Sequence, residues 1–175
     1  MKSSIALVGF MGAGKTTVGR VLARKLKRQL VELDSLIEMK SGKSVIEIFQ
    51  QDGEIVFREL EIEVTKQVAE NKNLVIACGG GIVLNKINID RLRKECVIVY
   101  LTASPEVIIK RTLGGEDRPL LNVADRTSEI RELLKFREPF YERAADITVD
   151  TSKLDVGTIA EQIRTKLKKH ESFRF

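Results

Sequence analysis

The sequence is poor in the residues that build disulfide frameworks and metal centres. In 175 residues it contains two cysteines, Cys78 and Cys96, and one histidine. The cysteines form no Cys-x-x-Cys pair and have no metal-type spacing with the histidine, so the pattern gives no indication of a zinc site. Each cysteine lies in an apolar segment that is typical of a buried strand. We therefore expect two reduced thiols in a cytoplasmic protein.

The chain also lacks any apolar run of about 18 residues, the length that a membrane-spanning helix needs. Apolar residues make up 43% of the sequence and charged residues 31%, which is the balance of a globular protein. No apolar segment with a small-residue cleavage site precedes the first glycine-rich stretch, so we expect neither a signal peptide nor a membrane partner. Without repeats, linkers or low-complexity segments, the length predicts one domain, residues 1–175.

Long blocks of one charge are missing too, although the net charge is +5. The densest basic cluster is RTKLKKH, residues 164–170, and a solvated helix face explains it better than a binding patch. We expect no nucleic-acid partner, and small anionic molecules account more simply for the remaining arginines. No long apolar stripe indicates an obligate partner, so we expect a monomer.

Short apolar strands alternate with helical patterns along the chain. Helical spacing is found after the first two strands, brokenly over 44–71 with Gly53 as the break, after Ser104-Pro105, through 133–136 and over 155–169. The expected strands are SSIALVG, LVELD, NLVIACGGG, CVIVYLTA and ITVD. This order predicts an α/β fold with a five-stranded parallel sheet and helices on both faces, whose ligands bind at the carboxyl ends of the strands.

A glycine-rich loop follows the first expected strand and opens a helix. Gly9 to Thr16 have the spacing G-x-x-x-x-G-K-T, which places backbone N–H groups around phosphates. Lys15 supplies charge to the β- and γ-phosphates and Thr16 a hydroxyl to Mg²⁺. The loop predicts a P-loop NTPase-like three-layer sandwich that binds a nucleotide, but it does not separate a kinase from an ATPase or a GTPase. The expected nucleotide contacts in the loop are Gly12, Ala13, Gly14, Lys15, Thr16 and Thr17.

Acidic residues and glycines end two other strands at the same rim. Asp34 closes the second strand, where it accepts or orients a substrate hydroxyl proton, or equally caps the next helix. Glu32 projects to the same side by strand alternation, within reach of a magnesium-bound water. Three consecutive glycines, Gly79, Gly80 and Gly81, favour close approach of the backbone to a ligand.

Three arginines are candidates for binding anions. Arg58 lies between Glu54 and Glu61 at helical spacing, so ion pairing at the surface is the alternative for it. Arg137 comes just before a proline that ends or bends its helix, a position that can aim the guanidinium at a carboxylate. Arg118 lies in a Gly- and Pro-containing loop, where it neutralises charge that develops during transfer or is an ordinary loop charge.

Taken together, these segments resemble the shikimate kinase family over nearly the whole chain. The matching stretches are GFMGAGKTTVGRVLA, LDSLIE, SGKSVIEIFQQDGEIVFRELE, CGGGIV, DRPLL and FREPFYERAAD. The resemblance implies transfer of the γ-phosphoryl group of MgATP to the 3-hydroxyl of shikimate, in chorismate and aromatic amino-acid synthesis. It also implies a substrate-binding helical region at about 34–62 and a mobile lid at about 113–125.

The resemblance assigns roles to residues as well. Asp34 contacts the ring hydroxyls, Arg58 and Arg137 hold the shikimate carboxylate, and the backbone of the triple glycine, Gly80 and Gly81 above all, closes over the substrate. Phe49 and Phe57 line the apolar face of the ring, although composition alone favours the core for both. Arg118 reaches the phosphates from the lid, and Arg111 packs near the adenine. One departure is Glu32, where the family commonly has aspartate.

Two rival interpretations stay open on the sequence. Another small-metabolite P-loop kinase, of gluconate or nucleotide type, shares the loop and the sheet but does not need two arginines for one carboxylate. A non-catalytic nucleotide- or nucleic-acid-binding module is the rival from a different class.

Overall fold

A computed structural model describes residues 1–112 and 125–175 of the chain, with a parallel five-stranded sheet at its centre. The strands follow the order β2-β3-β1-β4-β5, and every neighbouring pair is parallel. The strands are β1 (Ser4–Val8), β2 (Gln29–Glu32), β3 (Leu74–Ala77), β4 (Cys96–Thr102) and β5 (Ile147–Asp150). The predicted fold class is therefore confirmed.

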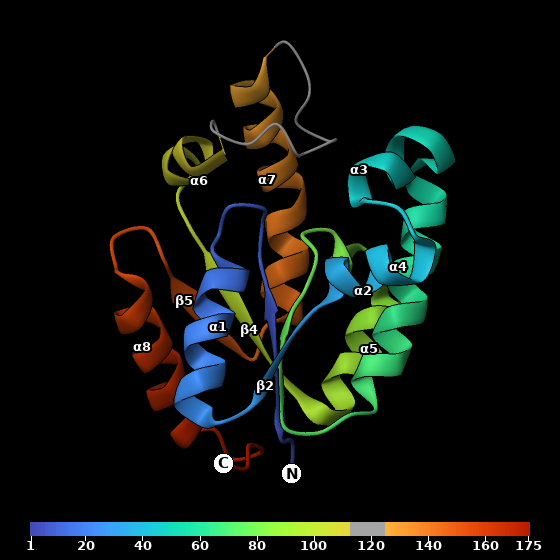
Figure 1. Ribbon diagram of the computed structural model, residues 1–175. Coiled ribbons are helices and arrows are strands. Elements are labelled where there is room, and N and C mark those ends of the chain that lie inside the picture. The colour runs from blue at the N-terminus through green and yellow to red at the C-terminus, as the bar shows by residue number, and fades with distance from the viewer. Residues whose placement is uncertain (113–124) are drawn as a thin grey trace.

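Helices cover both faces of the sheet (Figure 1). Helices α1 (Lys15–Leu26) and α8 (Val156–Lys168) pack together on one face. The other face carries α4 (Gly53–Ala69), α5 (Lys86–Glu95) and α7 (Arg126–Ala144). The remaining elements are α2 (Leu33–Ser41), α3 (Val45–Glu47), the π-helix Ile48–Asp52, the 3₁₀-helix Ile82–Leu84 and α6 (Pro105–Thr112). Helix α5 was not placed by the sequence analysis.

Side-chain alternation along β1 divides the core into two clusters. Ile5 and Leu7 face α1 and α8, whereas Ala6 and Val8 face α4, α5 and α7. All four side chains are fully buried, because a parallel sheet with helices on both faces exposes neither side of its central strand. The sheet is therefore a rigid platform whose carboxyl ends all open at one rim.

The second strand ends earlier than the sequence predicted. It stops at Glu32, and Asp34 lies in the first turn of α2 rather than at the strand end. The residue at the N-cap position is Glu32, which makes no side-chain cap bond, so the cap interpretation of Asp34 is also wrong. Strand alternation therefore cannot relate Glu32 to Asp34. The helix starts here because Leu33 and Ile37, one turn apart, are both fully buried.

Two further predictions concern helix breaks. The break at Gly53 is confirmed, because the π-helix ends there and Gly53 has a φ of 87° where α4 begins. Pro139 does not end α7, which continues to Ala144. The turn after Pro139 stays helical because Tyr141 and Ala144 pack in the core.

The expected lid, residues 113–125, falls outside the described residues apart from Asp125, and Arg118 with it. Cys78 and Cys96 are both buried free thiols, as predicted. Among the described residues no helix is long and apolar enough to cross a membrane.

Candidate active site

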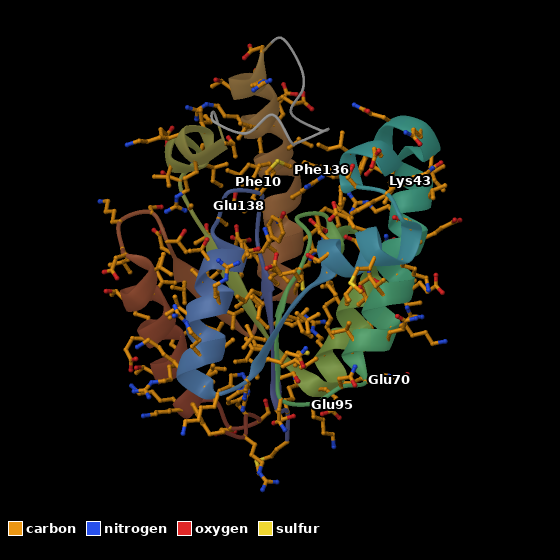
Figure 2. The ribbon with its side chains drawn as sticks, in the orientation of Figure 1. Phe10, Lys43, Glu70, Glu95, Phe136 and Glu138 are labelled. Atoms are coloured by element: carbon orange, nitrogen blue, oxygen red, sulfur yellow. The ribbon has the colours of Figure 1, made fainter. Side chains whose placement is uncertain are left out.

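A cavity of about 720 Å³ opens at the carboxyl ends of the strands. Phe10, two residues after the end of β1, lies toward this end of the molecule, whereas Glu70 and Glu95 lie near the opposite end (Figure 2). The cavity walls come from segments far apart in the sequence: the glycine-rich loop, the start of α2, the π-helix, α4, the triple glycine, α6, α7 and the turn after β5. The sheet thus gathers these segments around one space.

The glycine-rich loop forms one end of the cavity. Gly12 and Gly14 have φ values of 80° and 95°, left-handed conformations that side chains rarely adopt. Helix α1 begins at Lys15, so its unpaired N–H groups face the loop. The Lys15 ammonium donates hydrogen bonds to the carbonyl oxygens of Gly9 at 2.7 Å and Phe10 at 2.9 Å. This end of the cavity therefore combines backbone donors with a positive charge, which suits phosphate groups.

Two side chains with oxygen atoms lie beside the loop, Thr16 in α1 and Glu32 at the end of β2. The Thr16 hydroxyl donates a hydrogen bond to Glu32 Oε2 at 3.3 Å. The other Glu32 oxygen lies 3.9 Å from an Arg20 guanidinium nitrogen. Over residues 1–112 and 125–175 no group of three or more His, Cys, Asp or Glu side chains is arranged to hold a metal ion.

At the opposite end of the cavity, Arg58 is held by two glutamates. Its Nη1 donates to Glu61 at 3.0 Å, and its Nε and Nη2 donate to one oxygen of Glu54 at 3.3 and 3.1 Å. The Arg58 side chain is 15% exposed, and its pair with the buried Glu61 is shielded from water, whereas Glu54 is exposed. A β-carbon at Gly81 would overlap the guanidinium. The absence of side chains in the triple glycine thus leaves room for Arg58.

Arg137 is the second arginine of the site, and its side chain is buried. It is 3% exposed, and its Nε has no hydrogen-bond partner among the described residues. The guanidinium lies over the Phe10 ring, 5.8 Å from the centroid. The carbonyl oxygen of the neighbouring Gly80 accepts a hydrogen bond from Tyr141. A buried guanidinium without full pairing favours an anion in the adjoining cavity.

Two carboxylates flank Gly79. A β-carbon there would lie 3.1 Å from both Asp34 Oδ1 and Glu61 Oε2. Burial raises the pKa of Asp34, and the nearby Lys15 charge partly opposes this rise. Burial likewise raises the pKa of Glu61, against the attraction of Arg58. Glu61 Oε2 is buried without a hydrogen-bond partner in the described part of the chain.

Two phenylalanines give this end of the cavity an apolar wall. The rings of Phe49 and Phe57 are tilted by 39° with centroids 4.7 Å apart. Phe49 comes from the π-helix and Phe57 from the second turn of α4. Both pack with the core and line the cavity, so the core and pocket interpretations hold together.

Beyond the glycine-rich loop, Arg111 and Thr151 join α6 to the turn after β5. Arg111 donates to the Gly12 carbonyl at 3.2 Å, and to the hydroxyl and carbonyl of Thr151 at 3.1 and 2.9 Å. Apolar side chains complete this part of the cavity: Leu154, Val156 and Ile159. These apolar side chains beside a guanidinium suit an uncharged planar group.

The structure brings every predicted site residue that it describes to this one cavity, and only Arg118 lies outside the described residues. Glu61 and Thr151 are polar residues of the cavity that the sequence analysis did not assign to the site. Glu61 was considered only as an ion-pair partner, although its spacing of three from Arg58 placed it on the same helix face. Thr151 follows the fifth strand, and the rule that ligands bind at strand ends could have found it.

Comparisons with known proteins identify the family of the chain. The family model for shikimate kinase matches residues 11–168. The shikimate kinase of Caldanaerobacter subterraneus subsp. tengcongensis is 49% identical over 160 residues, covering 91% of this chain and 93% of the relative. That of Dehalococcoides mccartyi is 41% identical over 171 residues, with coverages of 98% and 97%. The solved structure of shikimate kinase from Acinetobacter baumannii in complex with shikimate has a TM-score of 0.94 at 37% identity, covering 98% of this chain and 96% of that one. The chain belongs to the shikimate kinase family.

Proposed function

We propose that this chain transfers the γ-phosphoryl group of ATP to the 3-hydroxyl of shikimate, giving shikimate 3-phosphate and ADP. One observation carries the proposal: a single cavity joins a phosphate-binding loop to two arginines and a carboxylate. The loop end suits the donor. The other end suits a hydroxylated carboxylic acid, because it offers cations for a carboxylate, an acceptor for a hydroxyl and an apolar wall for a ring.

At the donor end, Lys15 and the N-terminus of α1 bind the phosphates. The ammonium of Lys15 is placed across the loop by its bonds to Gly9 and Phe10, so its charge lies where the β- and γ-phosphates would be held. Phosphoryl transfer asks the protein mainly for alignment and for neutralisation of charge. Preorganised backbone donors supply both without reorganisation during the reaction.

The residues beside the loop fit Mg²⁺, which prefers oxygen ligands and is commonly held by few protein groups together with substrate phosphates. The Thr16 hydroxyl would be the protein ligand, and Glu32, 3.3 Å from it, would hold a magnesium-bound water. When bound, Mg²⁺ neutralises charge on the β- and γ-phosphate oxygens. Glu32 is one methylene longer than the aspartate common in the family, so its contact to such a water would differ from that of the aspartate.

At the acceptor end, Arg58 and Arg137 bind the carboxylate of shikimate. Both guanidinium groups border the triple glycine, whose backbone closes the space around them. Phe49 and Phe57 pack against the ring. Asp34, at the start of α2, accepts the proton of the 3-hydroxyl or orients that hydroxyl toward the γ-phosphate. Orientation matters because a positioned hydroxyl must compete with water as the acceptor.

The same proposal extends to organisation and setting. Residues 1–175 act as one kinase domain, with 34–62 as the substrate-binding helical region, and the chain works as a monomer. The two free buried thiols suit a reducing compartment, which supports the cytoplasm as the place of the reaction.

A coupled assay of ADP release tests the proposal, with shikimate, gluconate and AMP offered in parallel. We expect MgATP-dependent ADP release with shikimate and only background with the other two. Stimulation by gluconate or AMP but not by shikimate would overturn it in favour of another small-metabolite kinase.

A further inference from the structure

We propose that Thr151 is a positioning residue for the nucleotide, acting through Arg111. This inference rests on the proposed use of ATP. Thr151 belongs neither to the phosphate-binding loop nor to the acceptor-binding residues described above. Thr151 is 1% exposed, follows the last residue of β5 and borders the cavity. A hydroxyl so deeply buried at a cavity wall calls for an explanation beyond filling space.

The Thr151 hydroxyl is the meeting point of three segments. It lies within hydrogen-bond distance of the carbonyl oxygens of Ala13, at 3.2 Å, and Thr102, at 3.1 Å, and can donate its proton to either. Its oxygen accepts a hydrogen bond from Arg111 Nη1 at 3.1 Å. One side chain therefore connects the glycine-rich loop, the end of β4 and helix α6. The Thr151 backbone N–H also donates to Thr102, at 2.8 Å, which fixes the hydroxyl to the sheet.

Arg111 depends on these contacts for its orientation. It is an exposed residue on α6, and a free arginine side chain would sample many rotamers. Here Nη1 donates to Gly12 and to the Thr151 hydroxyl, and Nη2 donates to the Thr151 carbonyl. The backbone and Thr151 thus occupy the polar edge of the guanidinium. What remains for a ligand is its planar face, and such a face stacks on an aromatic ring.

The surroundings agree with this use of the face. Leu154, Val156 and Ile159 line the same part of the cavity and offer apolar contact but no charge. A nucleobase is flat and uncharged, whereas the phosphates of the same nucleotide lie against the loop. Thr151 therefore sets the angle at which Arg111 meets the base.

The test is the affinity for MgADP, measured by isothermal titration calorimetry on the full chain. Thr151→Val keeps the shape of the side chain and removes only the hydroxyl, and the backbone bonds of Thr151 to Thr102 and Arg111 remain. We expect the dissociation constant of MgADP to rise about five- to tenfold, the effect of losing one or two hydrogen bonds. Thr151→Ser restores the hydroxyl and should bind as the wild type does. Thr148→Val, at an exposed position on β5, is the matched control and should change nothing.

A double-mutant cycle identifies the route of the effect. If Thr151 acts through Arg111, then Arg111→Ala and the double variant Arg111→Ala/Thr151→Val bind MgADP equally. Fully additive losses would overturn the proposal, and so would a Thr151→Val variant that melts earlier but binds MgADP normally, since that is a structural role alone. Because MgADP binding needs no acceptor, the result stands even if the wild type does not phosphorylate shikimate.

Discussion

The guanidinium of Arg58 occupies the space in which a side chain at Gly81 would begin. The two residues come from α4 and from the segment after β3, and their contact explains why a glycine stands at this position. Gly81 has a φ of −95°, so it is not there for a left-handed conformation. Close approach to the arginine is the physical reason.

The first prediction concerns Gly81→Ala. The added methyl group must displace the guanidinium from the position in which Glu54 and Glu61 hold it. We expect the KM for shikimate to rise at least about tenfold, because a loss of about 1.4 kcal/mol of binding free energy already corresponds to that factor. The KM for ATP should change little. Steady-state kinetics with each substrate varied in turn measures both.

Gly80→Ala is the matched control for stability. A β-carbon there meets its nearest neighbour at 3.5 Å, an ordinary contact. Its melting temperature should stay near that of the wild type, whereas that of Gly81→Ala should fall. Equal melting temperatures for both variants, together with an unchanged KM for shikimate in Gly81→Ala, would contradict the contact with Arg58.

A second prediction concerns the shape of the cation at position 137. Arg137→Lys keeps the charge but loses the planar fork that binds a carboxylate through two parallel hydrogen bonds. Charge-assisted hydrogen bonds contribute about 1.5–3 kcal/mol, so the KM for shikimate should rise roughly ten- to a hundredfold. Arg143→Lys, on an exposed turn of the same helix, should behave as the wild type. The assignment fails if the KM for ATP rises as much as that for shikimate.

The sequence predicted the sheet well because its strands are short, apolar and separated by amphipathic helices. The glycine-rich loop was equally predictable, since its function depends on backbone conformations that only certain residues allow. Asp34 was misplaced because a strand followed at once by a buried helix has no glycine or proline to mark the boundary. Leu33 is apolar in either element, so only the tertiary packing decides between them.

The sequence also could not predict which polar groups are buried. Nothing in the spacing of Glu61 and Arg58 distinguishes a solvated pair from a desolvated one. That distinction comes from the triple glycine, which is distant in sequence and lies against both residues. Likewise Pro139 predicted that its helix ends or bends there, and α7 continues to Ala144 because residues beyond the proline are buried.

The third prediction follows from the buried carboxylate of Glu61. Burial raises its pKa, so the charged form is disfavoured in the folded state relative to the unfolded one. Such a group contributes its full stability below its unfolded pKa, and this contribution is lost as pH rises through the folded pKa. Glu61→Gln cannot ionise. We therefore expect the melting temperature of Glu61→Gln, relative to that of the wild type, to increase as the pH rises from 4.5 to 7.5.

The exposed Glu59 on the same helix supplies the control, since Glu59→Gln should show no such trend. Glu61→Gln should at the same time weaken shikimate binding, because Arg58 loses a charged partner at 3.0 Å. A variant that is more stable but binds shikimate less tightly is expected when the substituted residue belongs to a functional site. A melting-temperature difference that shrinks as pH rises would mean that the attraction of Arg58, and not burial, dominates the pKa of Glu61.

The last prediction concerns the protonation of Asp34. Burial raises its pKa above the ordinary value of 3.8, while Lys15 opposes the rise. Only the ionised carboxylate can accept the substrate proton, so activity must fall as pH drops through this raised pKa. The acid limb of kcat against pH should then lie above the range of an exposed aspartate. Asp34→Asn should lower kcat by about 10²–10⁴-fold if Asp34 is a general base, and its residual activity should lack that limb.

Asp90→Asn, at an exposed position on α5, is the control and should keep the wild-type dependence of kcat on pH. If Asp34→Asn keeps both a near-normal kcat and the acid limb, then Asp34 only orients the hydroxyl, and the titrating group is another one. Glu61, on the other side of Gly79, would be the next carboxylate to test, because burial raises its pKa in the same direction.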